Sequence, residues 1–536
     1  PRCIMPERRS DFKVSSTERQ VVRALGSIGG ATLLSRIAGF VRDVVVALAF
    51  GAGPLTDAFF VAFRIPNILR RLLAEGALST AMIPVFTEYS VTRAGAEFLR
   101  MLRAVLALAL VALTATAALG ILAAPWIVRA IAPGFTGDPA QLSLAVLLTR
   151  VMFPYLVLVG LAALATGALN ALGRFFSGAL GPALLNVGMI ATVLGLASRV
   201  EPPILALAIG VLVGGVGQLA VQLPDLYRCG LLVAPSVNLR HPALGRLVRL
   251  LVPAVFGLAA VQVMVFVNTL LGSLLPAGSI SYLYYADRLM EFPLGVFGIA
   301  LASASLPVMA RQAAAGDKRE VAETLTFALR LALYISLPAT VGLVALRAPI
   351  VRVLFERGRF GPAETAATAE ALAWYAIGLV GFAGARIAAQ SFYALGEAGT
   401  AVRWGIVSVV ANVIAALLLM GPLGYGGLAA AASIGAYVNV ATLAWAARRR
   451  LGPLGGRALV ASAGRTAAAS LPLAAWCGAA LVLWPAAPAR WLDGAWLAGA
   501  IAGGAGIFWA ASVLLGAPER VALVRMLPSR ERAGGG

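Results

Sequence analysis

The sequence predicts an all-α polytopic membrane protein with about fourteen transmembrane helices, arranged as two six-helix lobes followed by two carboxyl-terminal helices. Three observations predict this fold: the residue composition, the spacing of the apolar runs and an internal repeat. Of 536 residues, 60% are hydrophobic and 12% are charged, and the mean hydropathy is +0.89. A soluble domain has about 25% charged residues. A chain this apolar is therefore expected to form a bundle of membrane helices.

Apolar runs long enough to cross the hydrocarbon core recur along the whole chain. Glycine and proline residues interrupt several of them, which predicts tilts and kinks. The predicted spans are 24–50, 57–87, 101–131, 143–171, 178–198, 203–226, 247–275, 280–310, 324–346, 365–394, 400–420, 426–447, 465–486 and 494–516.

Lysine and arginine are concentrated in alternate loops, which predicts that both termini are cytoplasmic. The cationic outer loop 347–362 departs from this pattern, and we interpret it as an external amphipathic segment. The predicted parts are a cytoplasmic tail (1–23), an N-lobe with helices 1–6 (24–228), a cytoplasmic linker (229–246), a C-lobe with helices 7–12 (247–450), helices 13–14 (451–516) and a cytoplasmic tail (517–536).

An internal repeat relates the second and eighth predicted spans. ALSTAMIPV at 77–85 aligns without a gap with ALASASLPV at 300–308, and the same offset places Arg64 opposite Asp287. Because the eighth span comes six spans after the second, and six is even, both cross the membrane in the same direction. This pattern is typical of parallel six-helix halves related by an axis along the membrane normal.

Charged residues within these apolar segments form the candidate substrate site. An arginine at the bilayer centre costs about 2.5–3.5 kcal/mol and keeps its proton, so it needs water, a counter-ion or an anionic ligand. Positive charge is in excess here, which favours an anionic substrate such as a phosphate or diphosphate. Snorkelling to the interface is the alternative for Arg42 and Arg64. The candidates are Arg36, Arg42, Arg64, Arg70, Arg71, Arg288, Asp57, Glu75, Asp287 and Glu291.

No catalytic residue, metal site or cofactor is predicted. Cys3, Cys229 and Cys477 are isolated, and His241 is the only histidine. The sequence contains no GxxxxGK[ST] motif for nucleotide binding, so a gradient, the membrane potential or the flux of the substrate would drive transport, and a coupling ion is left open. The net charge of +20 belongs mainly to loop arginines, so no nucleic acid partner is expected.

Several long segments resemble the MurJ/MviN lipid II flippase family of the multidrug/oligosaccharidyl-lipid/polysaccharide exporter superfamily. They are LSRIAGFVRD (34–43), TDAFFVAFRIPNILRRLLAEGALSTAMIPVFTEY (56–89), APGF (132–135), QLPDL (222–226) and YYADRLMEFPLGVFGIALASASLP (284–307). The resemblance covers nearly the whole chain. It implies fourteen transmembrane helices, with two lobes around a cationic cavity and two further helices that help to form a groove for a polyprenyl tail.

The resemblance also implies an activity, which is outward translocation of lipid II by alternating access. Lipid II is the undecaprenyl-diphosphate-linked precursor of peptidoglycan, and the implied location is the bacterial cytoplasmic (inner) membrane. The family's cavity arginines fall on Arg36, Arg42, Arg70 and Arg288, and the accompanying acidic positions fall on Asp57, Glu75, Asp287 and Glu291. We expect a monomer whose partners are lipid II, membrane lipids and the cell-wall synthesis machinery.

Other functions remain open at this point. One is export of a different polyprenyl-diphosphate-linked saccharide, and another is drug/cation antiport, although an antiporter cavity should have surplus carboxylates. A membrane scaffold without transport activity would leave the arginines unexplained. An enzyme acting on a lipid-linked sugar is disfavoured, since the sequence offers no nucleophile motif.

Overall fold

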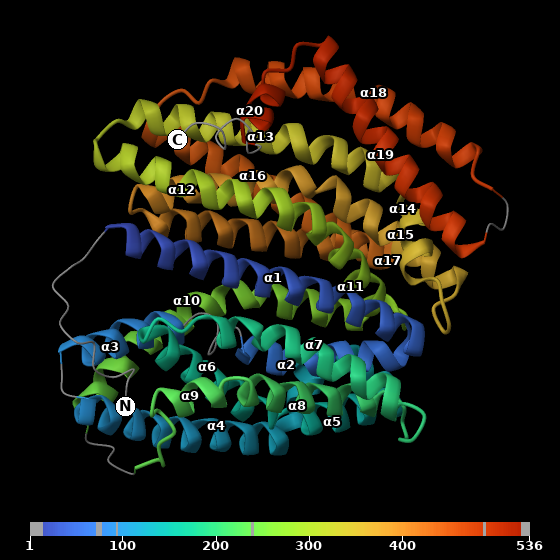
Figure 1. Cartoon of the computed structure of the whole chain (residues 1–536). Helices are drawn as coiled ribbons and strands as arrows, with labels where there is room; N and C mark the ends of the chain where they lie inside the picture. Colours follow the sequence, from blue (N-terminus) through green and yellow to red (C-terminus); the bar gives the residue numbers. More distant parts are fainter. Residues whose placement is uncertain (1–13, 71–77, 93–94, 237–240, 486–488, 527–536) are drawn as a thin grey trace. The chain divides into compact units, whose positions relative to one another are not determined.

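The computed structural model describes the chain except residues 1–13, 71–77, 93–94, 237–240, 486–488 and 527–536, and its regular elements in the described part are all helices (Figure 1). The helices divide into two compact units. Unit 1 comprises residues 1–278 together with 357–360, and unit 2 comprises 279–356 together with 361–536. Because every regular element in the described part of the chain is a helix, the predicted all-α fold is confirmed.

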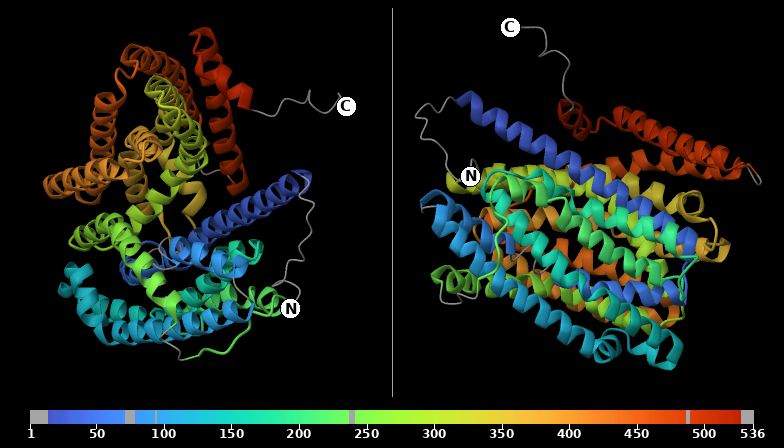
Figure 2. Two further views of the ribbon diagram at one scale, coloured as in Figure 1. Left: turned by 90° about the vertical axis from the view of Figure 1, so that its left-hand side faces the viewer. Right: turned by 60° about the horizontal axis from the view of Figure 1, so that its bottom comes forward.

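Unit 1 is built around long antiparallel helices whose apolar faces pack on one another. Helix α7 packs against α8 and α1 (Figures 1 and 2). Helix α6 packs against α3, α4 and α8, and α4 also packs against α3. Its elements are α1 Val14–Phe50, α2 Pro54–Arg70, α3 Leu78–Thr92, α4 Gly95–Ile131, the 3₁₀ turn η2 Pro133–Gly137, α5 Pro139–Met152, α6 Tyr155–Ala171, α7 Phe176–Leu196, α8 Leu205–Ala220, α9 Leu223–Arg228 and α10 Pro242–Ser273.

Unit 2 packs α16 against α17, and α13 against α16 and α18. Helices α18 and α19 lie side by side at the carboxyl-terminal end of the chain (Figure 2). The elements are α11 Ser279–Pro293, the π-helical turn η3 Leu294–Gly298, α12 Ile299–Ala314, α13 Lys318–Ala345, α14 Arg347–Phe355, α15 Pro362–Ile377, α16 Leu379–Ala394, α17 Ala398–Leu451, α18 Gly456–Val482, α19 Arg490–Leu514 and α20 Glu519–Met526.

Within the described residues, eight helices are long and apolar enough to cross a membrane, or nine if α15 and α16, which meet at a 42° bend, form one span. The total of fourteen spans therefore stays a prediction. One predicted division is confirmed inside α17, where Gly424 has φ +54° and ψ −130° and breaks the helix between the predicted spans 400–420 and 426–447. A positive φ strains any residue with a Cβ, so glycine suits this break.

An irregular turn interrupts the predicted eighth span. Helix α11 ends at Pro293, which the repeat offset of 223 residues aligns with Arg70. In unit 2 the following turn, Leu294–Gly298, is π-helical. Such turns recur where helices bend or serve a function. The predicted eighth span is therefore interrupted at a place that the apolar pattern alone does not reveal.

The division into units falls later in the chain than the predicted linker. The linker prediction places the boundary at 229–246, whereas the compact units separate after Gly278. The reason is α10, which packs on α3 and α4 of unit 1. The two compact units are defined by packing, whereas the two predicted lobes are defined by the sequence repeat. The division into units therefore does not test the lobe boundaries, which stay a prediction.

The cationic segment 347–362 forms a helix and a glycine turn. Helix α14 buries Ile350, Val351 and Phe355, while Arg347 is exposed, so the predicted amphipathic character is confirmed. The following residues belong to unit 1, where the Arg359 amide donates to the Leu48 carbonyl at 3.0 Å. Gly358 has φ +60°, and an added Cβ would lie 2.3 Å from the Leu48 oxygen, so only glycine fits this approach.

The predicted orientation can be tested at the two ends of α10. Ala234 and Ala277 are both exposed and flank this helix. In a variant lacking the native cysteines, we expect Ala234→Cys to be protected from a membrane-impermeant maleimide added to whole cells, and Ala277→Cys to react. The reason is that the basic 228–246 loop is predicted to be cytoplasmic. The reverse labelling pattern would overturn the span count.

Candidate functional site

Arg42 on α1 is buried, with 7% of its surface exposed. Its Nε and Nη2 donate to Asp43 Oδ1 at 3.0 and 2.6 Å, and its Nη1 donates to Asn186 Oδ1 on α7 at 3.0 Å. Asn186 Nδ2 donates to the Ser35 carbonyl at 3.2 Å. A buried charge needs such compensation. The structure therefore places Arg42 in a network that joins α1 to α7, a role not apparent from the sequence.

Arg36 lies on a different face of the same helix. Six residues at 100° each put it about 120° from Arg42 around α1. Its side chain is exposed beside the exposed Leu33 and Ile37, and within the described part of the chain it makes no hydrogen bond or ion pair. A permanent cation on an apolar helix without a protein partner needs water or an anion. Arg36 is the candidate whose charge the described residues leave uncompensated.

Asp57 is 2% exposed and lies in the first turn of α2. Its Oδ2 accepts a hydrogen bond of 2.6 Å from the amide of Gly278, which has φ +95° and follows α10. The preceding turn is closed by Thr56, whose Oγ1 accepts from the Gly53 amide at 2.9 Å. The hydrogen bond of Asp57 therefore connects the end of α10 to the start of α2, and we interpret Asp57 as a positioning residue within unit 1.

The two described arginines of α2 differ in their contacts. Arg64 Nη1 donates to the Val265 carbonyl of α10 at 3.3 Å. Arg70 on α2 donates from Nε and Nη2 to Asn67 Oδ1 at 3.2 and 2.9 Å. This contact orients the guanidinium. The candidates Arg71 and Glu75 lie outside the described residues.

In unit 2, Arg288 on α11 is half-buried and contacts two residues of its own helix. Its Nη1 donates to Glu291 Oε2 at 2.8 Å, and its guanidinium carbon lies 5.3 Å from the Tyr284 ring centroid. Arg288 and Glu291 therefore form an ion pair one turn apart on the same helix. Asp287 is half-buried on the same helix, while Glu291 is exposed. A polar, half-exposed guanidinium stacked on an aromatic ring is preorganised for an anion.

A second buried ion pair, in unit 2, was not predicted. Arg330 on α13 has apolar neighbours along the chain, and its Nε donates to Glu519 Oε1 of α20 at 2.8 Å. Ser462 Oγ of α18 donates to the same oxygen at 2.9 Å, and Glu519 is 2% exposed. The only signal in the sequence was a carboxylate at the start of a short polar segment, 189 residues away. Tertiary contact was needed to find it.

Arg352, from the cationic segment 347–362, also has a partner. It donates from Nη2 to Asp493 Oδ1 of α19 at 2.7 Å, and Trp484 Nε1 donates to the same oxygen at 2.7 Å. Among the described residues, no group of three or more His, Cys, Asp or Glu side chains could hold a metal ion. The charged groups thus divide into structural pairs, such as Arg352–Asp493, and candidates for ligand binding, such as Arg36.

Fold comparison defines the class of protein first. The fold matches that of a lipid II flippase MurJ in an inward closed conformation, with a TM-score of 0.76 and 23% identity over 91% of this chain and 98% of that one. It also matches an inward-facing multidrug resistance MATE family transporter of the MOP superfamily, with a TM-score of 0.63 and 17% identity over 79% of this chain and 96% of that one. The chain is an integral membrane protein with this shared exporter fold.

The chain belongs to the lipid II flippase MurJ family. The family model described as lipid II flippase MurJ matches residues 46–498. The chain is 38% identical to the lipid II flippase MurJ of Burkholderia cenocepacia over 78% of its own length and 82% of that protein. It is 37% identical to the probable lipid II flippase MurJ of Vibrio cholerae over 81% of its length and 83% of that protein. The resemblance seen in the sequence is confirmed.

Proposed function

We propose that this protein moves lipid II from the inner to the outer leaflet of the bacterial cytoplasmic membrane by alternating access through a cationic cavity. The observation that carries the proposal is the 38% identity, over most of both chains, to a protein named lipid II flippase MurJ. The uncompensated positive charge at Arg36 supports it independently, because the lipid's diphosphate is the anion such a residue needs.

Within this proposal, Arg36, Arg70 and Arg288 contact the diphosphate. Arg36 makes no hydrogen bond or ion pair in the described chain, the guanidinium of Arg70 is oriented by Asn67, and Arg288 can exchange Glu291 for the ligand. Arg42 and Asp57 are positioning residues and do not contact the ligand. Their buried hydrogen bonds connect α1 to α7 and the start of α2 to the end of α10. The diphosphate would then meet guanidinium groups that neighbouring polar groups already orient, which reduces the ordering cost of binding.

The proposed cycle uses no nucleotide. Crowding of like charges opposes closure of an empty cationic cavity, and the bound diphosphate relieves this repulsion, so substrate binding itself shifts the conformational equilibrium. The interior-negative potential contributes about 2.3 kcal/mol per elementary charge per 100 mV, favouring outward passage of the anion. The π-helical turn at Leu294–Gly298 and the break at Gly424 provide places where helices can bend.

Drug/cation antiport is the less favourable alternative. A cation carrier needs surplus carboxylates, whereas the three described acidic candidates all have partners. Asp57 accepts a hydrogen bond from a backbone amide, Glu291 pairs with Arg288, and Asp287 also has a partner. The fold likeness to the MATE transporter is also lower, with a TM-score of 0.63 against 0.76. An anionic lipid-linked cargo therefore suits this chain better than a cationic drug.

Cells depleted of the protein provide the test. We expect lipid II in such cells to be inaccessible to an externally added enzyme that cleaves its headgroup, and restoration of the protein to make it accessible again. Total lipid II measured in the same cells controls for synthesis. Unchanged accessibility after depletion, in a strain with no other flippase, would refute the proposal.

A further inference from the structure

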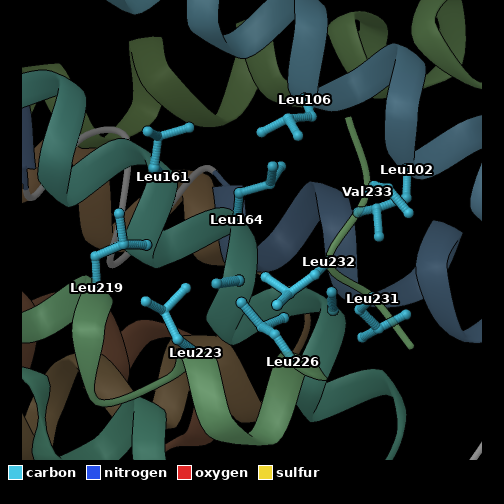
Figure 3. A pocket seen from close by; sticks show the side chains of 12 residues that line it. Leu102, Leu106, Leu161, Leu164, Leu219, Leu223, Leu226, Leu231, Leu232 and Val233 are labelled. Carbon is cyan, nitrogen blue, oxygen red and sulfur yellow. The ribbon is translucent and has the colours of Figure 1, made fainter. Parts of the chain in front are cut away.

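A pocket of about 170 Å³ lies within unit 1 and is lined by apolar side chains alone (Figure 3). Its walls come from α4, α6, α8 and α9, and from the extended residues 231–233 that follow α9. Figure 3 shows leucines from these segments pointing toward one another around it. None of the ten candidate substrate residues lines this pocket. It is therefore separate from the proposed diphosphate site.

The pocket has a closed floor and an open rim. Leu164, Leu226 and Leu231 are buried, whereas Leu223 and Leu232 are 43% and 52% exposed. An apolar cavity of this size stays dry and takes apolar ligands. In a membrane protein, the apolar material that reaches an open rim is the hydrocarbon of the surrounding lipids, which is as apolar as leucine.

Two exposed cations lie next to pocket residues along the chain. Arg103 follows the pocket residue Leu102 on α4, and Arg228 ends α9 two residues after the pocket residue Leu226. Both side chains are exposed, and neither has a hydrogen bond or ion pair in the described part of the chain. Asp225 on α9 carries an opposing charge, so Arg103, Arg228 and Asp225 together carry a net positive charge. This positive charge is complementary to a lipid phosphate group.

We propose that this pocket binds one acyl chain of an anionic glycerophospholipid, whose phosphate lies between Arg103 and Arg228. The predicted cytoplasmic position of the 228–246 loop places the site in the inner leaflet, where anionic headgroups attract basic residues. The lipid is a resident ligand and not the cargo, because α1, which carries Arg36 and Arg42, contributes nothing to the pocket.

The bound lipid would stabilise the connection between α9 and α10. The Ser236 amide donates to the Arg103 carbonyl at 3.1 Å, so the linker already follows α4 beside the rim. The floor residues Leu226 and Leu231 belong to a core that also contains Leu244 of α10. Filling the pocket adds contacts to these segments, and an occupied site is expected to raise the thermal stability of the protein.

The test uses the full chain in nanodiscs that contain phosphatidylglycerol with a photoreactive group in its acyl chain. We expect adducts concentrated in peptides covering 102–106, 161–168 and 223–233. Leu161→Trp, which places an indole in the pocket, should reduce these adducts several-fold. Leu119→Trp, at a 66% exposed position elsewhere on α4, is the matched control and should not. Equal adducts in both variants would overturn the proposal.

The headgroup contact is tested separately, which keeps the proposal decidable if the tryptophan variant misfolds. Unlabelled phosphatidylglycerol should compete with the photoreactive probe for the pocket. Replacing Arg103 or Arg228 by alanine should weaken this competition by about fivefold for each arginine, and competition by phosphatidylcholine should not change. Arg199→Ala, an exposed arginine before α8 at the opposite end from the pocket, should have no effect. Displacement of the probe by a polyprenyl diphosphate but not by phosphatidylglycerol would assign the pocket to the cargo and refute a resident lipid.

Discussion

Replacing Arg36 by alanine is expected to prevent growth of a flippase-depleted strain while leaving the amount of protein in the membrane unchanged. Arg36 is exposed and makes no hydrogen bond or ion pair in the described chain, so its loss removes no internal contact. It would remove charged hydrogen bonds to the diphosphate, which corresponds to roughly a 10- to 100-fold loss of substrate binding. Complementation and accessibility of lipid II to an external enzyme are the measurements.

The same loss is expected for Arg70→Ala and Arg288→Ala, and lysine should substitute poorly because it lacks the planar fork. Arg199→Ala is the control, since Arg199 is exposed and lies in the connection before α8. Arg42→Ala should differ from Arg36→Ala by lowering thermal stability as well, because Asp43 would lose its buried partner. Full growth with alanine at Arg36, Arg70 and Arg288 together would rule out the diphosphate assignment.

Replacing Glu519 by alanine is expected to lower the free energy of unfolding by about 3–5 kcal/mol, the usual cost of breaking a buried ion pair. Glu519 is 2% exposed and accepts hydrogen bonds from Arg330 and Ser462, which join α13, α18 and α20. The variant leaves Arg330 without its anion. Thermal unfolding of purified protein in one detergent, followed through the intrinsic tryptophan fluorescence, measures the change.

Helix α13 provides a matched control. Arg319 and Glu323 also form an ion pair, but their side chains are 89% and 64% exposed. Such surface pairs contribute about 0–1 kcal/mol, so Arg319→Ala should change stability little. A double variant with methionine at Arg330 and Glu519 should recover much of the loss, because no unpaired charge remains. A decrease for Glu519→Ala no larger than that for Arg319→Ala would contradict the structural role of this pair.

The interrupted helices show how far the sequence pattern extends. The gap between the predicted spans 400–420 and 426–447 coincides with the break at Gly424, because glycine and proline mark where helical geometry fails. The repeat likewise predicts that the second and eighth spans correspond. The exact ends do not follow from hydropathy, however. Helix α18 begins at Gly456, nine residues before the predicted span, since polar residues outside the hydrocarbon can still form helical hydrogen bonds.

The sequence by itself determined that this protein is a helical membrane protein, which family it resembles, and that its apolar spans carry an excess of arginine. These properties depend on composition and local spacing. Only the tertiary structure decided what each charge does. Arg42 meets Asn186 and Arg330 meets Glu519 across 144 and 189 residues, and Asp57 is occupied by the Gly278 amide. The free energy of a buried charge depends on its spatial partners, which the order of residues along one helix does not specify.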